Sequence, residues 1–543
     1  MSILPLLPII ILLGGALAIA LSRLAHFRQV DALASVVSLL ALAAMIVSAA
    51  AGFQMQETLV STWQPLSVFG VPVSLRVDRV GWSIGFVAVL ACAATALAGL
   101  AYPGRRRFGP RALALGMTAA LVGAVFAANL LTLALAWGLF DALFAIAALM
   151  RSEGAQAGRR AAFAIGFNGA ATVSLWIAAL MLNQAHESLF WHLTHLTDSA
   201  RGFLTAAAIF RLGLYPLSQW LPAERDDAPG RVALLYVLPP LAGLYILIRL
   251  AELNAVPQEP VLIWLGALSI LIGGALAWLR SDSRDALPYV SLSSLGAIVL
   301  AGASGQPASA PQALILSGAG SWALAIMTLS LSRTLDRQMP WWSVGHALAL
   351  ATLAGVPATL GLAVQTGLAA GVASSDHFLL IACMVIGQAL TFGALLRLMI
   401  APAQNPPPSG VPATITYIVA LALVAPAPFL LPALARSAVP EWTPPAFEVV
   451  LSRLGALGGV ILIMPIALAI ALVWLGRGPT SVPRFNPGRL LNLDWLYDLL
   501  FQVVNVAVRY LSNISALVEG EGAVLWALLI LIATYVVLSG TIQ

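Results

Sequence analysis

The sequence contains no lysine, and all 27 of its basic residues are arginine. Burial in a membrane lets a lysine give up its proton, whereas an arginine keeps its charge. A proton relay in this chain therefore cannot use a lysine. The abundance of alanine, glycine and proline indicates codon bias as the simplest cause, and the chemical consequence is the same whatever the cause.

Cysteine and charged residues are also scarce. The two cysteines, Cys92 and Cys383, both fall inside hydrophobic stretches, which excludes a disulfide framework and a paired-cysteine site for zinc or an iron–sulfur cluster. Only 9% of the residues are charged, against about 25% in soluble domains. We expect no catalytic centre, metal or cofactor in the chain itself. Nucleic-acid binding is not expected either, because the arginines are scattered over many loops.

Hydrophobic sequence is what the chain has in abundance, at 60% of its residues. We expect an all-α polytopic membrane protein with about sixteen transmembrane helices, because each stretch has roughly the 17 to 25 apolar residues that a bilayer requires. The first stretch lacks the basic region and the cleavage site of a signal peptide, so we expect it to be retained. The predicted spans are 3–22, 31–52, 80–101, 111–127, 129–150, 160–183, 201–221, 229–250, 261–279, 285–303, 311–333, 343–368, 377–400, 411–432, 450–475 and 522–540.

Arginines occupy every second loop between these spans. They cluster, for example, at Arg105 to Arg107, at Arg159 and Arg160, and at Arg333 and Arg337, whereas loops such as 184–200 carry almost none. By the positive-inside rule the arginine-bearing loops are cytoplasmic. We therefore expect a multi-pass protein of the bacterial inner membrane with its N-terminus outside.

Two spans are interrupted by helix breakers. Pro216 follows Gly213 in the span 201–221, and Gly355 and Pro357 lie within the span 343–368. Discontinuous helices at corresponding positions of two halves are typical of inverted-repeat transporters, although glycine and proline are also common in ordinary membrane helices. On the repeat interpretation, helices 7 and 12 are broken, and the two breaks meet around Arg211 at the centre of the bilayer.

Two segments outside the spans have patterns of their own. Residues 53–79 alternate polar and apolar side chains, which predicts a β-hairpin outside the membrane. Residues 488–516 have an amphipathic pattern and predict a short lateral helix on the membrane surface.

The repeat interpretation divides the chain into six parts. The parts are 1–110 with helices 1 to 3, 111–250 as the first five-helix repeat, 261–402 as the second, 411–475 with helices 14 and 15, the lateral helix 488–516 and the final span 522–540.

The candidates for a functional ionisable residue within a span are Asp141, Arg211, His346 and Arg397. Each costs at least about 2.5 to 3.5 kcal/mol in a bilayer and is a functional candidate for that reason. Arg249 and Asp78 lie near the outer boundary, where long side chains reach the interface at little cost. Asp141 and Arg211 form a possible charged pair, with a static structural pair as the alternative, or Arg211 capping carbonyls freed by the break. His346 titrates near neutral pH and is a candidate gate, with an ordinary hydrogen-bonded histidine as the alternative.

The run from Arg211 to Pro222, followed by Asp226, Asp227 and Pro229, has a specific order of residues. It resembles the signature of the antiporter-like membrane subunits of respiratory complex I, which is shared by Mrp-type cation/proton antiporters and membrane-bound hydrogenases. Further stretches agree with this resemblance over roughly residues 1–400, and the C-terminal helices resemble the family member that carries a lateral helix. The agreeing stretches are Ser74 to Asp78, Asn129 to Trp137, Ser281 to Gly296 and Gly355 to Gly361.

The resemblance implies a glutamate on helix 5 paired with a lysine on helix 7, and further lysines or histidines on helices 8, 11 and 12. This chain departs from that pattern. Gly138 replaces the glutamate, with Asp141 one turn further on, and Arg211 replaces the helix 7 lysine. The remaining positions are Leu241 with Leu235 or Tyr236 on helix 8, Leu324 on helix 11 and Gln365 on helix 12.

Three functions are consistent with the sequence. The first is an antiporter-like subunit of a complex I-like assembly that translocates protons or Na⁺ with partner membrane subunits along a lysine-free path. The second is a non-conducting scaffold subunit of such a complex, or a subunit of an Mrp-type antiporter. The third is a stand-alone solute transporter, which the scarcity of buried polar residues disfavours.

Overall fold

A computed structural model describes most of the chain between residues 6 and 475. The chain divides into two compact units, residues 1–482 and 483–543. The predicted lateral helix 488–516 and final span 522–540 lie outside the described residues, apart from six isolated helical positions. The described residues are 6–22, 29–53, 58–61, 71–101, 108–150, 155–220, 231–253, 260–280, 283–304, 311–332, 343–374, 377–400, 410–443 and 447–475, with 499, 502, 506, 509, 510 and 512.

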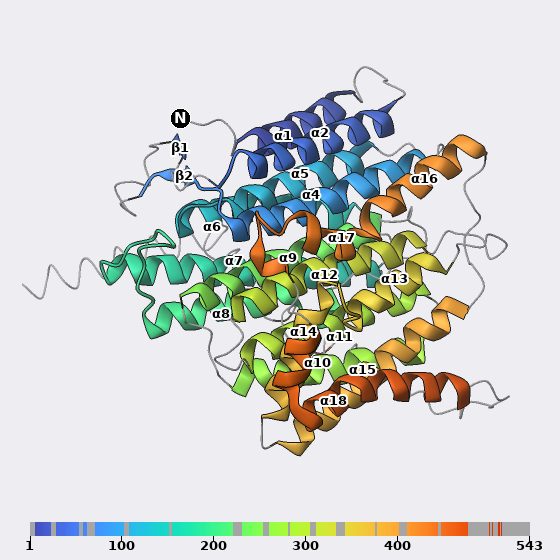
Figure 1. Cartoon of the computed structure of the whole chain (residues 1–543). Coiled ribbons are helices and arrows are strands. Elements are labelled where there is room, and N and C mark those ends of the chain that lie inside the picture. The colour runs from blue at the N-terminus through green and yellow to red at the C-terminus, as the bar shows by residue number, and fades with distance from the viewer. Residues whose placement is uncertain are drawn as a thin grey trace, which may run out of the picture. The chain divides into compact units, whose positions relative to one another are not determined.

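Helices account for nearly all of the first unit (Figure 1). Every predicted span up to residue 475 coincides with one helix or with two half-helices, so the all-α prediction is confirmed. The helices are α1 (Leu7–Ser22), α2 (Val30–Ala50), α4 (Arg79–Leu100), α5 (Phe108–Val125), α6 (Leu130–Leu149), α7 (Ala155–Gln184), α8 (Asp198–Leu212), η1 (Leu217–Trp220), α9 (Arg231–Glu252), α10 (Pro260–Leu279), α11 (Ser283–Ala303), α12 (Pro311–Ser332), α13 (Val344–Leu353), α14 (Gly361–Ala373), α15 (Phe378–Ile400), α16 (Val411–Val424), α17 (Ala427–Leu434), η2 (Pro440–Trp442) and α18 (Phe447–Leu475).

Among the described residues, ten helices are long and apolar enough to cross a membrane, or eleven if α16 and α17 are counted as one bent span. Helices α1, α5, α13 and α14 are apolar but shorter. The two short halves α13 and α14 follow each other within one predicted span, as expected for a broken helix. The coarse architecture is therefore a polytopic helical bundle.

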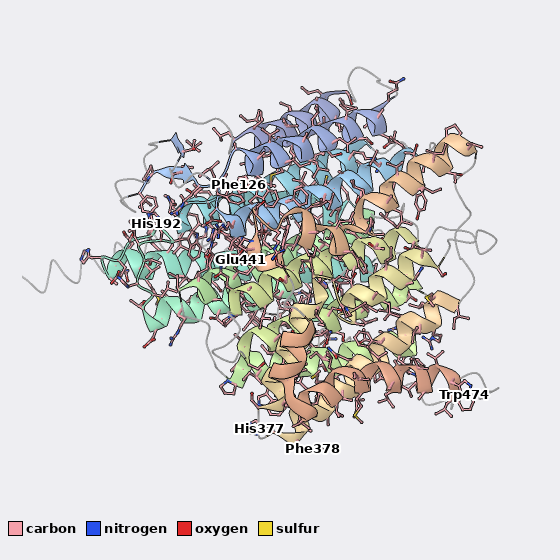
Figure 2. The ribbon with its side chains drawn as sticks, viewed as in Figure 1. Phe126, His192, His377, Phe378, Glu441 and Trp474 are labelled. Atoms are coloured by element: carbon pink, nitrogen blue, oxygen red, sulfur yellow. The ribbon has the colours of Figure 1, made fainter. Side chains whose placement is uncertain are left out.

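Three helices form the centre of the bundle. The most apolar window is 94% buried in α4 and wholly buried in α9 and α12. Figure 1 shows α9 and α12 in the middle, with α1 and α2 on one side and α15 and α18 on the other. Helix α18 is only 22% buried, and Trp474 projects from its end with 71% of its surface exposed (Figure 2). The outer helices thus present apolar surface to the surroundings, as membrane-spanning helices do.

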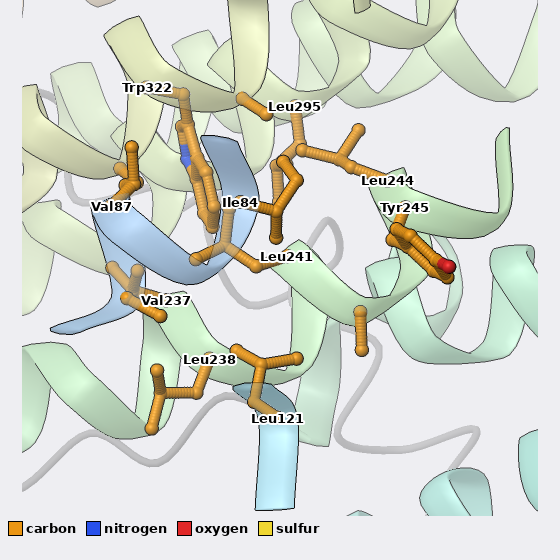
Figure 3. Close-up of a cluster of buried hydrophobic side chains, with 14 of the residues drawn as sticks. Ile84, Val87, Leu121, Val237, Leu238, Leu241, Leu244, Tyr245, Leu295 and Trp322 are labelled. Carbon is orange, nitrogen blue, oxygen red and sulfur yellow. The ribbon is translucent and has the colours of Figure 1, made fainter. Parts of the chain in front are cut away.

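A continuous apolar cluster fills the middle of this core (Figure 3). Helix α9 contributes Val237, Leu238 and Leu241, which pack with Ile84 of α4 and Trp322 of α12. Leu241 is fully buried. Nearly all side chains of this cluster are apolar. Its polar groups include the Trp322 indole, whose N–H donates to Ser291 Oγ at 3.1 Å, and the hydroxyl of Tyr245.

A small sheet covers one end of the bundle. Strand β1 (Thr58–Ser61) pairs antiparallel with β2 (Val73–Leu75), which agrees with the hairpin predicted for residues 53–79. Asn129 joins β2 to α6, because its amide nitrogen donates to the Pro72 carbonyl at 2.9 Å while its oxygen accepts from the Thr132 N–H at 2.9 Å. The side chain therefore caps α6 and anchors the sheet together.

Asp78 performs a similar double function at α4. One carboxylate oxygen accepts from the Gly81 N–H at 2.8 Å and caps the helix, and the other pairs with Arg249 at 2.5 Å. Arg249 also pairs with Glu252 at 2.6 Å and lies over the Tyr245 ring at 4.9 Å. The cluster thus joins the start of α4 to the end of α9.

Substitutions at Asp78 are expected to separate these two functions. Asp78→Asn retains an oxygen for the cap, whereas Asp78→Ala removes both the cap and the ion-pair partner, so alanine should cost about 1 kcal/mol more than asparagine. Thermal unfolding of the two purified variants checks this. Equal losses of stability would show that the cap contributes nothing.

Candidate functional site

The first helix break positions Arg211. Helix α8 begins with the Thr197 side chain accepting from the Ala200 N–H at 3.3 Å, and it ends at Gly213 in a left-handed conformation with φ 61°. Glycine adopts this conformation without steric penalty, so it is a common helix terminator. The chain then turns through Tyr215, whose N–H donates to Ser269 Oγ of α10 at 2.9 Å. Arg211 lies in the last turn of α8, and the end of the helix at Gly213 fixes its position in the chain.

The Arg211 guanidinium is completely buried and has three polar partners. It forms an ion pair with Asp141 of α6 and donates to Asn168 Oδ1 of α7 at 2.8 Å. Its second terminal nitrogen donates to Thr172 Oγ1 at 3.3 Å. The Thr172 hydroxyl in turn donates to the second oxygen of Asp141 at 2.5 Å. The cation, the carboxylate and the two neutral groups form one closed network.

Aromatic rings complete the surroundings of the guanidinium. Its central carbon lies 4.2 Å from the centre of the Trp137 ring and 5.4 Å from that of Phe140. Residues 137, 140 and 141 share one face of α6 because they are three and four positions apart, and Asn168 and Thr172 share one face of α7 for the same reason. Ring faces attract a cation by their quadrupole, so the site stabilises a permanent positive charge by ionic, polar and aromatic contacts together.

The carboxylate of this network lies near the outer surface of the bundle. The Asp141 side chain is 17% exposed, and neighbouring positions on α6 and α7 are small and open. A Cβ added at Gly138, Gly166 or Gly169 would meet no atom within 4 Å. Asp141 therefore lies between the buried cation and a surface lined with small residues.

The second helix break has a different composition. Helix α13 ends before Gly355, which has φ 72°, and α14 begins at Gly361. The Gln365 amide of α14 crosses the break and donates to the Leu353 carbonyl at 2.7 Å. Gln388 of α15 donates to Gln365 Oε1 at 3.0 Å. A small cavity next to these amides is lined by described residues from α11 to α15, none of them ionisable.

The two breaks do not meet around Arg211, so that part of the sequence interpretation is wrong. The polar partners of Arg211 come from α6 and α7, whereas the cavity at the second break is lined by α11 to α15. The apolar side chains of α4, α9 and α12 occupy the middle of the bundle. Each half of the bundle consequently has its own polar centre.

The other sequence candidates lie apart from the Arg211 network. His346 is buried in the first turn of α13. Arg397 of α15 lies over the Trp278 ring at 5.0 Å and donates to the Arg280 carbonyl at the end of α10. Pro216 precedes η1, and Pro357 is exposed within the second break. No group of three or more metal-ligating side chains occurs in the described part of the chain.

The sequence interpretation missed three polar residues of these sites. Asn168, Thr172 and Gln388 are uncharged, so a search for ionisable groups within the spans does not identify them. A signal for two of them is present in the sequence, because Asn168 and Thr172 are four residues apart in the middle of a largely apolar span and so lie on one face of the helix.

Residues 127–391 match the model of the family described as NADH:quinone oxidoreductase/Mrp antiporter, transmembrane. The resemblance to the antiporter-like membrane subunits is confirmed. The matched segment contains Asp141, Arg211 and both helix breaks. It ends close to the end of α15, so the match covers both polar centres.

Individual relatives agree with this family. The chain is 29% identical over 218 residues to NADH-quinone oxidoreductase subunit N of Rhodopseudomonas palustris, covering 37% of this chain and 47% of the relative. It is 27% identical over 256 residues to the subunit N of Xanthomonas euvesicatoria, covering 41% of this chain and 52% of the relative. The chain thus spans about half the length of the curated relatives it matches.

Solved structures share the fold of the antiporter-like chain over a greater length. A chain of the Mrp complex from Dietzia sp. matches 99% of this chain and 63% of its own length with a TM-score of 0.75 and 18% identity. A chain of the membrane-bound sulfane sulfur reductase, an archaeal respiratory membrane complex, matches 98% of this chain and 99% of its own length with a TM-score of 0.71 and 19% identity. A chain of respiratory complex I from Thermus thermophilus covers 79% of this chain and 98% of its own length, with a TM-score of 0.59 and 21% identity.

Proposed function

We propose that the chain is an antiporter-like membrane subunit of a complex I-like, energy-converting assembly and takes part in proton or cation translocation coupled to electron transport. The observation that carries this proposal is the buried Arg211–Asp141 network within the antiporter-like fold. An ionisable pair in a bilayer is costly and therefore indicates function. The described part of the chain contains no group of three or more metal-ligating side chains, and in this proposal partner subunits perform the electron transfer.

Within this network, Asp141 is the group that carries the proton. Arginine stays charged in proteins, and Thr172 and Asn168 are neutral. When Asp141 takes up a proton, the guanidinium keeps its contact with Asn168 Oδ1 at 2.8 Å and with the Trp137 ring at 4.2 Å. These contacts hold the cation in place while its counter-ion is neutralised, so the carboxylate can bind and release a proton repeatedly.

A non-conducting scaffold subunit is the second candidate, and the apolar centre favours it. Leu241 and Leu324 are fully buried and belong to the apolar cluster in the middle of the bundle. Neither side chain can bind a proton, so a path through the middle would lack a titratable group at these two positions. The same chain could then connect active neighbours without conducting.

Proton translocation by the reconstituted complex distinguishes the two candidates. We expect Asp141→Asn to reduce translocation about a hundredfold or more, the typical contribution of one proton-transfer group, and Asp141→Glu to restore part of it. Asp31→Asn is the matched control, because Asp31 forms a comparable ion pair with buried Arg111 between α2 and α5. Unchanged translocation in a fully assembled Asp141→Asn complex would establish the scaffold function.

The finer topology belongs to the same proposal. We place sixteen crossings in a bacterial inner membrane, two inverted five-helix repeats over 111–250 and 261–402, the N-terminus outside and a lateral helix over 488–516. The alternation of arginine-bearing loops and the two broken helices support this arrangement. The open surface around Gly138, Gly166 and Gly169 supports contact with a partner membrane subunit, because small residues let helices approach closely.

A further inference from the structure

Two arginines at one end of the bundle differ from the buried arginines in their partners. Arg280 directly follows α10, and Arg397 lies in the last turn of α15, which packs against α10. The buried residues Arg111, Arg211 and Arg249 each form an ion pair with an aspartate. None of the ion pairs between described residues includes Arg280 or Arg397. This end of α10 and α15 therefore carries positive charge that no described carboxylate balances.

The two cations lie close together. The Arg397 guanidinium donates to the backbone carbonyl of Arg280, so the two guanidinium groups are separated by about the length of one arginine side chain. Asp285 lies in the first turn of α11 and forms an ion pair with neither arginine. Arginine keeps its charge in proteins, and like charges at short range disfavour each other. An anion bound beside both arginines would remove this repulsion.

Most donors of the two guanidinium groups are available to such an anion. A guanidinium has five N–H donors. Arg397 uses one terminal nitrogen for the Arg280 carbonyl, and Arg280 uses one for the Tyr289 hydroxyl at 3.3 Å. Both arginines are partly exposed, and neither contributes to the described buried atoms that have no partner. The remaining donors form planar forks, whose geometry matches the oxygen atoms of a phosphate group.

Aromatic side chains place this charged end at the level of a membrane interface. The central carbon of the Arg397 guanidinium lies 5.0 Å from the centre of the Trp278 ring. The same atom of Arg280 lies 5.3 Å from the centre of the Tyr289 ring. Tryptophan and tyrosine are enriched at the depth of the lipid head groups. The two arginines therefore lie where the phosphate groups of a bilayer are expected.

Apolar surface adjoins the two arginines. Helices α10, α15 and α18 lie side by side (Figure 1). A Cβ built at Gly393 of α15 would lie 3.0 Å from the Trp278 ring of α10 and 3.7 Å from the Ala469 carbonyl oxygen of α18, so the three helices meet one turn before Arg397. Near their ends these helices expose Leu279, Ile400, Ile470, Trp474 and Leu475. A ligand with an anionic head and apolar chains matches both surfaces.

We propose that Arg280 and Arg397 bind the phosphate group of an anionic phospholipid, whose acyl chains lie along α15 and α18. Basic pockets between transmembrane helices are typical binding sites for anionic head groups. The lipid phosphate provides the counter-ion for both arginines and joins the end of α10 to the end of α15. This proposal rests on the location of these helices in a membrane and does not depend on proton translocation at Asp141.

Photo-crosslinking of the assembled complex in phosphatidylcholine nanodiscs tests this site. The probe is a phosphatidylglycerol with a diazirine in its acyl chain, and mass spectrometry measures the label on peptides from α15 and α18. We expect Arg280→Gln and Arg397→Gln each to lower this label about fivefold, the effect of one basic residue near an anionic lipid surface. Arg436→Gln is the matched control, because it removes the same charge from an exposed arginine outside α10, α15 and α18.

Competition identifies the ligand. Unlabelled phosphatidylglycerol should displace the probe, whereas displacement by inorganic phosphate would assign the site to a free anion and overturn the proposal. Unchanged labelling in both Arg280→Gln and Arg397→Gln would overturn it too, and so would an equal decrease in Arg436→Gln. Arg280→Gln leaves the backbone carbonyl that Arg397 contacts in place, so it carries the test if Arg397→Gln fails to assemble.

Discussion

Replacing Asp141 by leucine is expected to destabilise the protein more than replacing Arg211 by leucine. Asp141→Leu leaves a fully buried guanidinium that cannot lose its charge, and removing one partner of a buried pair costs about 3–5 kcal/mol. Arg211→Leu leaves a carboxylate that can take up a proton, so its cost is smaller. Thermal unfolding of the purified complex measures both losses.

The double variant Asp141→Leu with Arg211→Leu is the control for this asymmetry. Replacing both partners of a buried pair by apolar residues is often neutral or stabilising, so the double variant should recover most of the stability that Asp141→Leu loses. If the two losses were simply additive, the residues would not be coupled, and the pair would not be the element that stabilises this part of the bundle.

Gly361→Ala is expected to have the second large effect, because it disrupts the second break. A Cβ at this position would lie 1.7 Å from the Thr352 carbonyl oxygen, and backbone on backbone cannot be relieved by a side-chain rotation. Overpacking of a buried site typically costs about 1–3 kcal/mol and occasionally more, and we expect the upper part of that range. Yield of assembled complex and its unfolding temperature are the measurements.

Gly14→Ala in α1 is the matched control, because a Cβ there meets nothing within 4 Å. Alanine is also a better helix former than glycine by roughly 1 kcal/mol, so this variant should be neutral or slightly stabilising. Equal losses from Gly361→Ala and Gly14→Ala would mean that α13 and α14 do not approach as closely as the structure shows.

The sequence predicts the elements well because hydrophobic length and helix breakers act locally. Each span is recognised from its apolar residues alone, and the stops at Gly213 and Gly355 follow from the left-handed conformations that glycine favours. The approach of Asp141 to Arg211 was a possibility raised by the cost of lone charges in lipid. The ion pair shows that the two charges do lie together.

The surroundings of each break are not predictable in the same way, because they depend on which helices pack together. Asn168 and Thr172 reach Arg211 only since α7 lies beside α6 and α8. The Gln365–Gln388 contact joins two helices whose relative rotation is set by tertiary packing. The expectation that both breaks meet at Arg211 was mistaken for this reason. Pseudosymmetry predicts that the two breaks occupy equivalent positions in the two repeats, but it does not predict which helices lie between them.

Infrared difference spectroscopy of the complex during turnover tests the central claim most directly, namely that Asp141 gains and loses a proton while Arg211 stays charged. We predict a turnover-linked band of a protonated carboxylic acid that disappears in Asp141→Asn and persists in Asp31→Asn. An identical band in wild type and Asp141→Asn, with proton translocation unchanged, would contradict the account and leave the Arg211 network with a purely structural function.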